Sequence, residues 1–157
     1  MGPAIAPFNA FLIGLGVETL SLRMEKHLAN TKKVAEFLEA HDLVESVTWA
    51  SLRSSPFYEL AQKYTPKGAG SVIAFIIKGG REAGIKFVDG LELHSNVANI
   101  GDVRSLVIHP ASTTHSQLTE EELEAAGAPA GLVRLSVGLE DVDDILADLK
   151  QSFDRIK

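Results

Sequence analysis

Residues 71–77, SVIAFII, form a continuous run of apolar and β-branched side chains. Such a run is typical of a buried β-strand, and Gly79 and Gly80 end it. In residues 81–91 the apolar side chains return at helical spacing, so a helix is expected to follow the strand. This change of period from strand to helix predicts an α/β fold.

The same alternation of strand and helix patterns extends along the rest of the chain. Strands are predicted at residues 44–49, 105–108 and 132–137, and helices at residues 57–64, after Thr119 and at 141–156. The periodicity over residues 8–38 predicts one long helix, or two joined near Gly14–Gly16, so that residues 1–40 form a long helix leading into the domain. The 157 residues show no repeat or linker, so we expect one domain with a small mixed sheet and helices packed on it.

Composition and charge argue against several kinds of partner. A net charge of −6 and a pI near 5.3 offer no basic surface for nucleic acid or for an anionic membrane. The chain has no cysteine, and the six-residue spacing of His109 and His115 is not a metal-ligand spacing, so we expect no metal site. No stretch of about 20 apolar residues is present, and the apolar N-terminal residues lack a preceding basic region, so we expect a cytoplasmic protein.

Arg134 is the candidate binding residue with the clearest geometry. It lies in the predicted strand LVRLSVG, residues 132–138, whose period of two places it on one face with Ser136 and places Leu135 on the other. Two interpretations are open. An arginine there can simply lie on the solvated face of a half-exposed sheet, or it can offer a rigid, planar guanidinium that suits a carboxylate.

Two loop segments carry polar residues whose role the pattern leaves open. Residues 96–102, NVANIGD, combine small residues, amides and a glycine, which suits either a plain turn or a backbone that approaches a ligand. The hydroxyls of residues 112–114 can line a pocket or cap a loop. None of the lysines stands in the context of a buried Schiff-base lysine, and no phosphate-binding glycine pattern is present.

Several motifs, taken together, resemble the Cys/Met-metabolism family of pyridoxal phosphate (PLP) enzymes. They are residues 7–10 (PFNA), 18–24 (ETLSLRM), 99–102 (NIGD), 105–115 (SLVIHPASTTH) and 133–140 (VRLSVGLE). They occur in the family's order over essentially the whole chain. Within the family, the chain is most similar to the branch of O-acetylhomoserine sulfhydrylases.

The resemblance implies the C-terminal domain of a fold-type I PLP enzyme, usually a homotetramer. It implies that Arg134 binds the α-carboxylate of the amino-acid substrate and that the backbone of Asn99 assists. Lyase relatives tend to have serine at the position of Asn99, which favours a sulfhydrylase. The family's PLP-binding lysine and its other cofactor contacts precede the region that this chain matches, so the N-terminal PLP-binding domain is absent here. We therefore expect a fragment with no catalytic or cofactor-binding residue, which binds no PLP and is inactive alone.

For the parent enzyme, the resemblance implies a step of methionine biosynthesis. O-acetylhomoserine and sulfide would be converted to homocysteine and acetate with PLP as cofactor. Two alternatives stay open: the C-terminal domain of a methionine or cystathionine gamma-lyase, and a non-catalytic module that serves folding or assembly.

Overall fold

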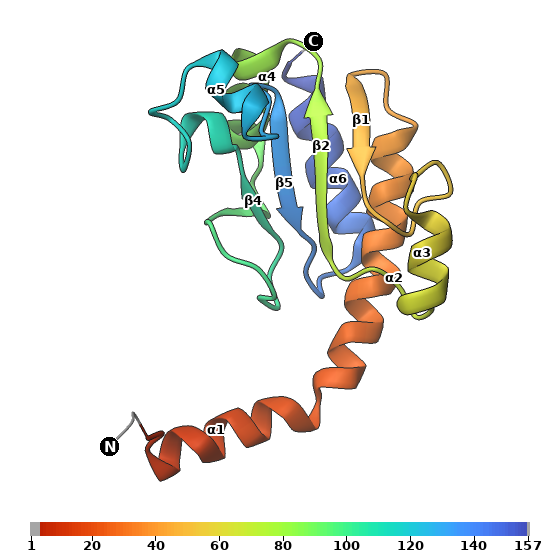
Figure 1. The fold of residues 1–157 in the computed structure, drawn as a ribbon, viewed down its shortest axis with the longest axis vertical. Coiled ribbons are helices and arrows are strands. Elements are labelled where there is room, and N and C mark those ends of the chain that lie inside the picture. The colour runs from red at the N-terminus through yellow and green to blue at the C-terminus, as the bar shows by residue number, and fades with distance from the viewer. Residues whose placement is uncertain (1–3, 157) are drawn as a thin grey trace.

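A single mixed sheet of five strands forms the centre of the molecule (Figure 1). The computed structural model describes residues 4–156; residues 1–3 and Lys157, at the ends of the first and last predicted helices, lie outside it. The strands are β1 (Val44–Thr48), β2 (Val72–Ile77), β3 (Ser95–Asn96), β4 (Leu106–Ile108) and β5 (Leu132–Ser136). Their order is β1-β2-β5-β4-β3, and all pairs are antiparallel except β3 with β4. The predicted α/β class is confirmed.

Three of the helices cover one face of this sheet. The helices are α1 (Pro7–Glu18), α2 (Leu20–Glu39), α3 (Tyr58–Tyr64), α4 (Gly80–Gly90), α5 (Glu120–Ala125) and α6 (Val142–Asp154), with a short 3₁₀ helix η1 (Pro110–Ser112). Helix α6 packs on both α2 and α4. Helix α2 contacts β1 and β2, α4 contacts β2 and β5, and Phe153 of α6 meets Phe75 of β2; Figure 1 shows α2 and α6 behind the sheet. In residues 4–156, the opposite face carries no such layer of long helices.

The core lies between the sheet and these three helices. Phe75, Phe87 and Phe153 contact one another through their rings and are buried, as are the alternate residues Val133 and Leu135 of β5. The period-two pattern of residues 132–137 therefore assigned the inward face correctly. Arg134 and Ser136 consequently lie on the other face of the sheet.

The prediction that residues 71–77 form a strand buried throughout is wrong for one face. Ile73, Phe75 and Ile77 are buried against the helices, whereas Val72 is 36% exposed and Ala74 is partly exposed. The physical reason is that helices cover only one side of β2, since its two neighbours are antiparallel and need no crossover helix on the second side.

Residues 7–39 form two helices and not one long helix, and their junction lies at Thr19 instead of Gly14–Gly16. Glycine lowers helix stability by roughly 1 kcal/mol relative to alanine but leaves every backbone hydrogen bond in place, so the two glycines remain helical. At Thr19 the guanidinium of Arg23 donates to the Gly16 carbonyl and, at 3.4 Å, to the Thr19 hydroxyl. The bond to Gly16 satisfies a carbonyl that the break leaves without a helical partner.

Helix α1 has apolar side chains on all sides and none of them is buried. It extends away from the rest of the chain in Figure 1. A helix that is apolar all round is normally enclosed by protein, so α1 leaves an unusually large apolar surface uncovered. Within residues 4–156, no helix is both long and apolar enough to cross a membrane.

We expect this chain to self-associate through α1 at micromolar concentrations. The double substitution Phe11→Glu/Leu15→Glu places two charges on exposed positions of α1 and should yield a monomer in sedimentation-velocity experiments. Leu60→Glu/Tyr64→Glu is the matched control, since it changes two exposed apolar residues at the same spacing on α3. A wild-type chain that sediments as a monomer would contradict the expectation.

Candidate functional site

Arg134 lies in the middle of β5, the central strand of the sheet. Its neighbours across the sheet are Ala74 of β2 and Ile108 of β4, and all three lie on the face away from the helices. The Arg134 Nη2 atom donates to the carbonyl oxygen of Asn99 at 3.3 Å. The structure thus brings together the two residues that the sequence singled out for substrate binding, although they are 35 positions apart.

Asn99 meets Arg134 through its backbone carbonyl. Its own N–H donates to the carbonyl of Val97 at 2.9 Å, and its side-chain Oδ1 accepts the N–H of Ile100 at 2.9 Å. The other polar groups of Asn99 therefore shape its loop, and the carbonyl is the group that it presents to the guanidinium.

The Arg134 guanidinium has no ionic partner in residues 4–156. The ion pairs of this region involve other residues, among them Arg104 with Asp102 and Arg155 with Glu92. Its one hydrogen bond there goes to Asn99. A guanidinium has five N–H donors, so this one retains a free edge for an anion.

The turn after β4 is built around the buried side chain of His109. Its Nε2 lies 2.8 Å from the Ala130 carbonyl and its Nδ1 2.8 Å from the Ser112 hydroxyl, while Thr113 Oγ1 donates to the His109 carbonyl at 2.8 Å. Burial lowers the pKa of His109 below its ordinary value, against the raising effect of the Ala130 carbonyl. A neutral imidazole that donates from Nε2 fits this arrangement. Ser112 and Thr113 thus hold this turn through their hydroxyls, and Thr114 Oγ1 lies 2.8 Å from His115 Nδ1.

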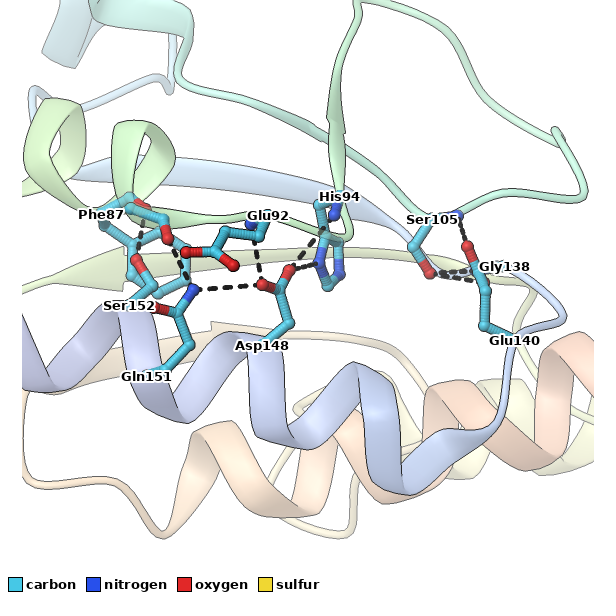
Figure 2. Close-up of polar contacts among 10 residues, drawn as sticks. Phe87, Glu92, His94, Ser105, Gly138, Glu140, Asp148, Gln151 and Ser152 are labelled. Carbon is cyan, nitrogen blue, oxygen red and sulfur yellow. Dashed lines mark hydrogen bonds and ion pairs between the residues drawn. The ribbon is translucent and has the colours of Figure 1, made fainter.

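Sequence analysis missed a buried pair formed by His94 and Asp148. Figure 2 shows Asp148 on α6 pointing at His94, whose Nδ1 lies 2.7 Å from Asp148 Oδ2. The carboxylate also accepts the N–H groups of Glu92 at 2.8 Å and His94 at 3.2 Å, and Nε2 of Gln151 at 3.1 Å. The available signal was the place of Asp148 in the helical pattern, between Ile145 and Leu149 on the inward side of α6.

These hydrogen bonds determine the charge of Asp148. Burial alone would raise the pKa of its carboxyl, but the bonds from the His94 side chain and from the backbone N–H groups of residues 92–94 outweigh it and hold the pKa far below the ordinary value. Asp148 is therefore an ionised group that fixes the chain between α4 and β3 onto α6. In the described part of the chain, His94 Nε2 has no hydrogen-bond partner.

Glu140 fixes the end of β5 to the start of β4. Its two carboxylate oxygens accept the N–H of Ser105 at 2.6 Å and the Ser105 hydroxyl at 3.0 Å, as Figure 2 shows. The N–H of Gly138 donates to Ser105 Oγ at 2.9 Å. Gly138 and Glu140, near the end of the motif VRLSVGLE, therefore have a structural role: they bind the chain after β5 to Ser105, which precedes β4.

A groove of about 1040 Å³ lies elsewhere, between α2 and residues 49–68. Apolar side chains such as Trp49 and charged ones of both signs such as Lys32 and Glu36 line it. Neither Arg134 nor Asn99 contributes to the lining. A groove with this mixed charge offers no concentrated positive potential for a carboxylate, so we place the candidate site at Arg134.

Comparison with known proteins assigns the family. Residues 1–154 match the family model of Cys/Met metabolism PLP-dependent enzymes. The chain belongs to this family.

Relatives within the Cys/Met family carry more than one activity. The chain is 55% identical over 157 residues to an O-acetyl-L-homoserine sulfhydrylase of Leptospira meyeri, covering 99% of this chain and 36% of the relative. It is 52% identical over 155 residues to an L-methionine gamma-lyase of Treponema denticola, covering 99% of this chain and 38% of the relative. The chain thus spans little more than a third of the length of the curated relatives that it matches.

A solved structure from the same family shares the fold. It is a Campylobacter jejuni protein assigned as an O-acetylhomoserine (thiol)-lyase, with a pyridoxyl-lysine monophosphate adduct. The TM-score is 0.88 at 45% identity, and the match covers 98% of this chain and 36% of that one. The mixed α/β fold therefore corresponds to about a third of a fold-type I PLP-dependent lyase.

The residues of this chain do not by themselves fit PLP. The cofactor of such enzymes forms a Schiff base with a lysine held in an enclosed site. All lysines in residues 4–156 are exposed. The candidate binding group of this chain is the guanidinium of Arg134, whose remaining donors can pair with an anion.

Proposed function

We propose that this chain is the C-terminal, substrate-binding part of an O-acetylhomoserine sulfhydrylase. The observation that carries the substrate-binding role is the guanidinium of Arg134, which is fixed to the central strand, held by the Asn99 carbonyl and free of any ionic partner in residues 4–156. The 55% identity to the Leptospira meyeri sulfhydrylase supports the activity. Such a group suits the α-carboxylate of an amino acid, because its parallel N–H donors match two carboxylate oxygens.

The surroundings of Arg134 favour a bound carboxylate. Ala74 beside it is small and leaves room above the sheet, and Ile108 on the other side is apolar and buried. An apolar neighbour lowers the local dielectric constant, which strengthens a pair of opposite charges. Asn99 acts on the carboxylate through Arg134, since its carbonyl takes up one donor and limits rotation of the guanidinium.

The proposed reaction replaces the acetoxy group of O-acetylhomoserine by sulfide, giving homocysteine and acetate. PLP would supply the electron sink for this exchange, and residues outside this chain would hold it. Arg134 would bind and orient the substrate and would transfer no proton. We also propose that the complete enzyme is a homo-oligomer, since α1 exposes a surface that needs protein to cover it.

A methionine gamma-lyase is the second candidate. Its support is the Treponema denticola relative, which is nearly as similar as the Leptospira meyeri sulfhydrylase. Both activities begin with an amino acid, so Arg134 serves either one. The distinction must therefore come from the products.

Two chimeric holoenzymes would test the activity. In each, this chain replaces the matching segment, in one case of the Leptospira meyeri sulfhydrylase and in the other of the Treponema denticola lyase. We expect the first chimera to form homocysteine from O-acetylhomoserine and sulfide at about the parental rate. The second should lose roughly tenfold or more in cleavage of methionine alone, since substrate discrimination depends on the residues that contact the substrate, and the exchange replaces those of this segment. Full lyase activity in the second chimera with loss of activity in the first would support the lyase instead.

A further inference from the structure

The loop that carries Asn99 contacts β5 at two points. The Asn99 carbonyl accepts from Arg134 Nη2 at 3.3 Å, and the Gly101 N–H donates to the Ser136 hydroxyl at 3.2 Å. The contacting residues are two positions apart on both segments. Because Arg134 and Ser136 lie on the same face of the strand, the loop runs along β5 and is held by two successive hydrogen bonds. We call these four residues the loop latch.

Ser136 supplies the hydrogen-bond acceptor for Gly101 in the latch, and its side chain is held in place. It is 1% exposed, and its partners across the sheet are Val72 of β2 and Leu106 of β4. A buried side chain on a central strand has little freedom to turn, so its hydroxyl oxygen stays where it can accept the Gly101 N–H. A buried hydroxyl also needs such a partner, because an unpaired one carries a desolvation cost.

Gly101 supplies the matching backbone geometry. Its φ is +74°, in the left-handed region that glycine adopts without steric cost. A Cβ added there would meet no heavy atom within 4 Å, so packing does not explain the glycine. Its conformation directs the N–H toward Ser136 and carries the loop back toward the sheet.

The rest of the loop has little else to fix it. Residues 96–101 are exposed, and β3 before them has only two residues. Besides the latch, the position of the Asn99 carbonyl depends on the short pairing of β3 with β4, on the Val97 N–H bond to the Val107 carbonyl and on the Asn99 N–H bond to the Val97 carbonyl.

We infer that Ser136 and Gly101 are positioning residues: they hold the Asn99 carbonyl against Arg134 and thereby direct the guanidinium toward the substrate carboxylate. The inference rests on the proposed function of Arg134, but the latch itself can be tested without it. The two tests below separate the contact from its effect on substrate.

The first test measures amide hydrogen exchange by NMR in this chain. Ser136→Ala removes the acceptor of the Gly101 N–H and should speed exchange of that amide about tenfold or more. The Gly127 amide, which donates to the Glu124 carbonyl, is the internal control and should keep its rate. An unchanged Gly101 rate would show that the contact with Ser136 does not hold the loop.

The second test compares Gly101→Ala with Gly127→Ala in the sulfhydrylase chimera. Gly127 is the matched control because it is also exposed, has φ +70° and would likewise place its Cβ in open space. Both substitutions should therefore lower Tm to a similar extent. Only Gly101→Ala should raise KM for O-acetylhomoserine, about three- to tenfold, with kcat within about twofold and KM for sulfide unchanged.

Failure of the latch and failure of the proposed function give different results. If Arg134→Ala raises KM for O-acetylhomoserine but Gly101→Ala behaves like Gly127→Ala, the latch inference is wrong and the proposed function stands. If Arg134→Ala leaves KM and kcat unchanged, the proposed function is wrong, and the latch remains only as the loop contact that hydrogen exchange measures.

Discussion

Replacing Arg134 by alanine in the sulfhydrylase chimera should lower kcat/KM for O-acetylhomoserine about ten- to more than a hundredfold. A bidentate contact between arginine and a carboxylate contributes roughly 1.5 to 3 kcal/mol, and alanine removes both donors. Steady-state kinetics with varied O-acetylhomoserine at saturating sulfide would measure the change. The loss should be small for substrate analogues that lack the carboxylate.

Two further variants test whether the planar pair of guanidinium donors, and not charge alone, matters at position 134. Arg134→Lys keeps the positive charge but loses the planar pair of donors, so it should recover only part of the activity. Arg104→Ala is the control, since Arg104 is an exposed arginine that pairs with Asp102 in the same region. Equal losses from Arg104→Ala and Arg134→Ala, or no loss from either, would remove Arg134 from the substrate site.

Replacing Asp148 by alanine should destabilise the chain by about 3 to 5 kcal/mol, the range expected when one partner of a buried pair is removed. The substitution leaves the His94 Nδ1 and the N–H groups of Glu92 and His94 without their acceptor. Within the described residues both ring nitrogens of His94 would then lack a partner. Urea unfolding in the Phe11→Glu/Leu15→Glu background, which avoids self-association, would measure the free energy.

The effect of Asp148 should also depend on pH. The pKa of its carboxyl is lowered in the folded chain, so its contribution is complete above the ordinary value near 3.8 and is lost as the pH falls below it. The difference between wild type and Asp148→Ala should therefore shrink in acid. Asp144→Ala, at an exposed position of the same helix, is the control and should cost less than about 1 kcal/mol. A similar loss from both variants would contradict the special role of Asp148.

Local patterns predicted most of the secondary structure. Strand period identified the buried face of β5, and the helical stripe of residues 141–156 identified α6. The helix predicted after Thr119 is α5, and residues 119–122, TEEE, form a capping box at its start: Thr119 Oγ1 accepts the Glu122 N–H, and Glu122 bonds back to the Thr119 N–H. These features depend on residues within a few positions of one another, which is why a single sequence suffices for them.

Features that depend on distant parts of the chain could not be predicted in the same way. The pairing of His94 with Asp148 joins residues 54 positions apart, and no local period points from one to the other. The break at Thr19 depends on where α2 packs and on the reach of the Arg23 side chain. The exposed side of β2 follows from the absence of a covering helix, which is a property of the whole sheet.

In the candidate site, too, some features follow from local patterns and others depend on distant parts of the chain. The period of two placed Arg134 on the face away from the core, and family resemblance named Asn99 beside it. Only the folded chain shows that the Asn99 carbonyl, and not its side chain or N–H, meets the guanidinium. The contribution of Gly101 and Ser136 likewise depends on a loop whose path no local pattern describes.

The strand order has a consequence for synthesis of the protein. β5 is the last strand to be made, yet it lies between β2 and β4 and joins the two halves of the sheet. On the ribosome, β1 with β2 can pair early, while β4 has no partner on its β5 side until residues 132–136 emerge. Arg134 lies on that last strand, so the candidate site would form in the same late step that completes the sheet. A nascent chain that stalls before residue 132 would therefore have neither a finished core nor Arg134 in place on the sheet.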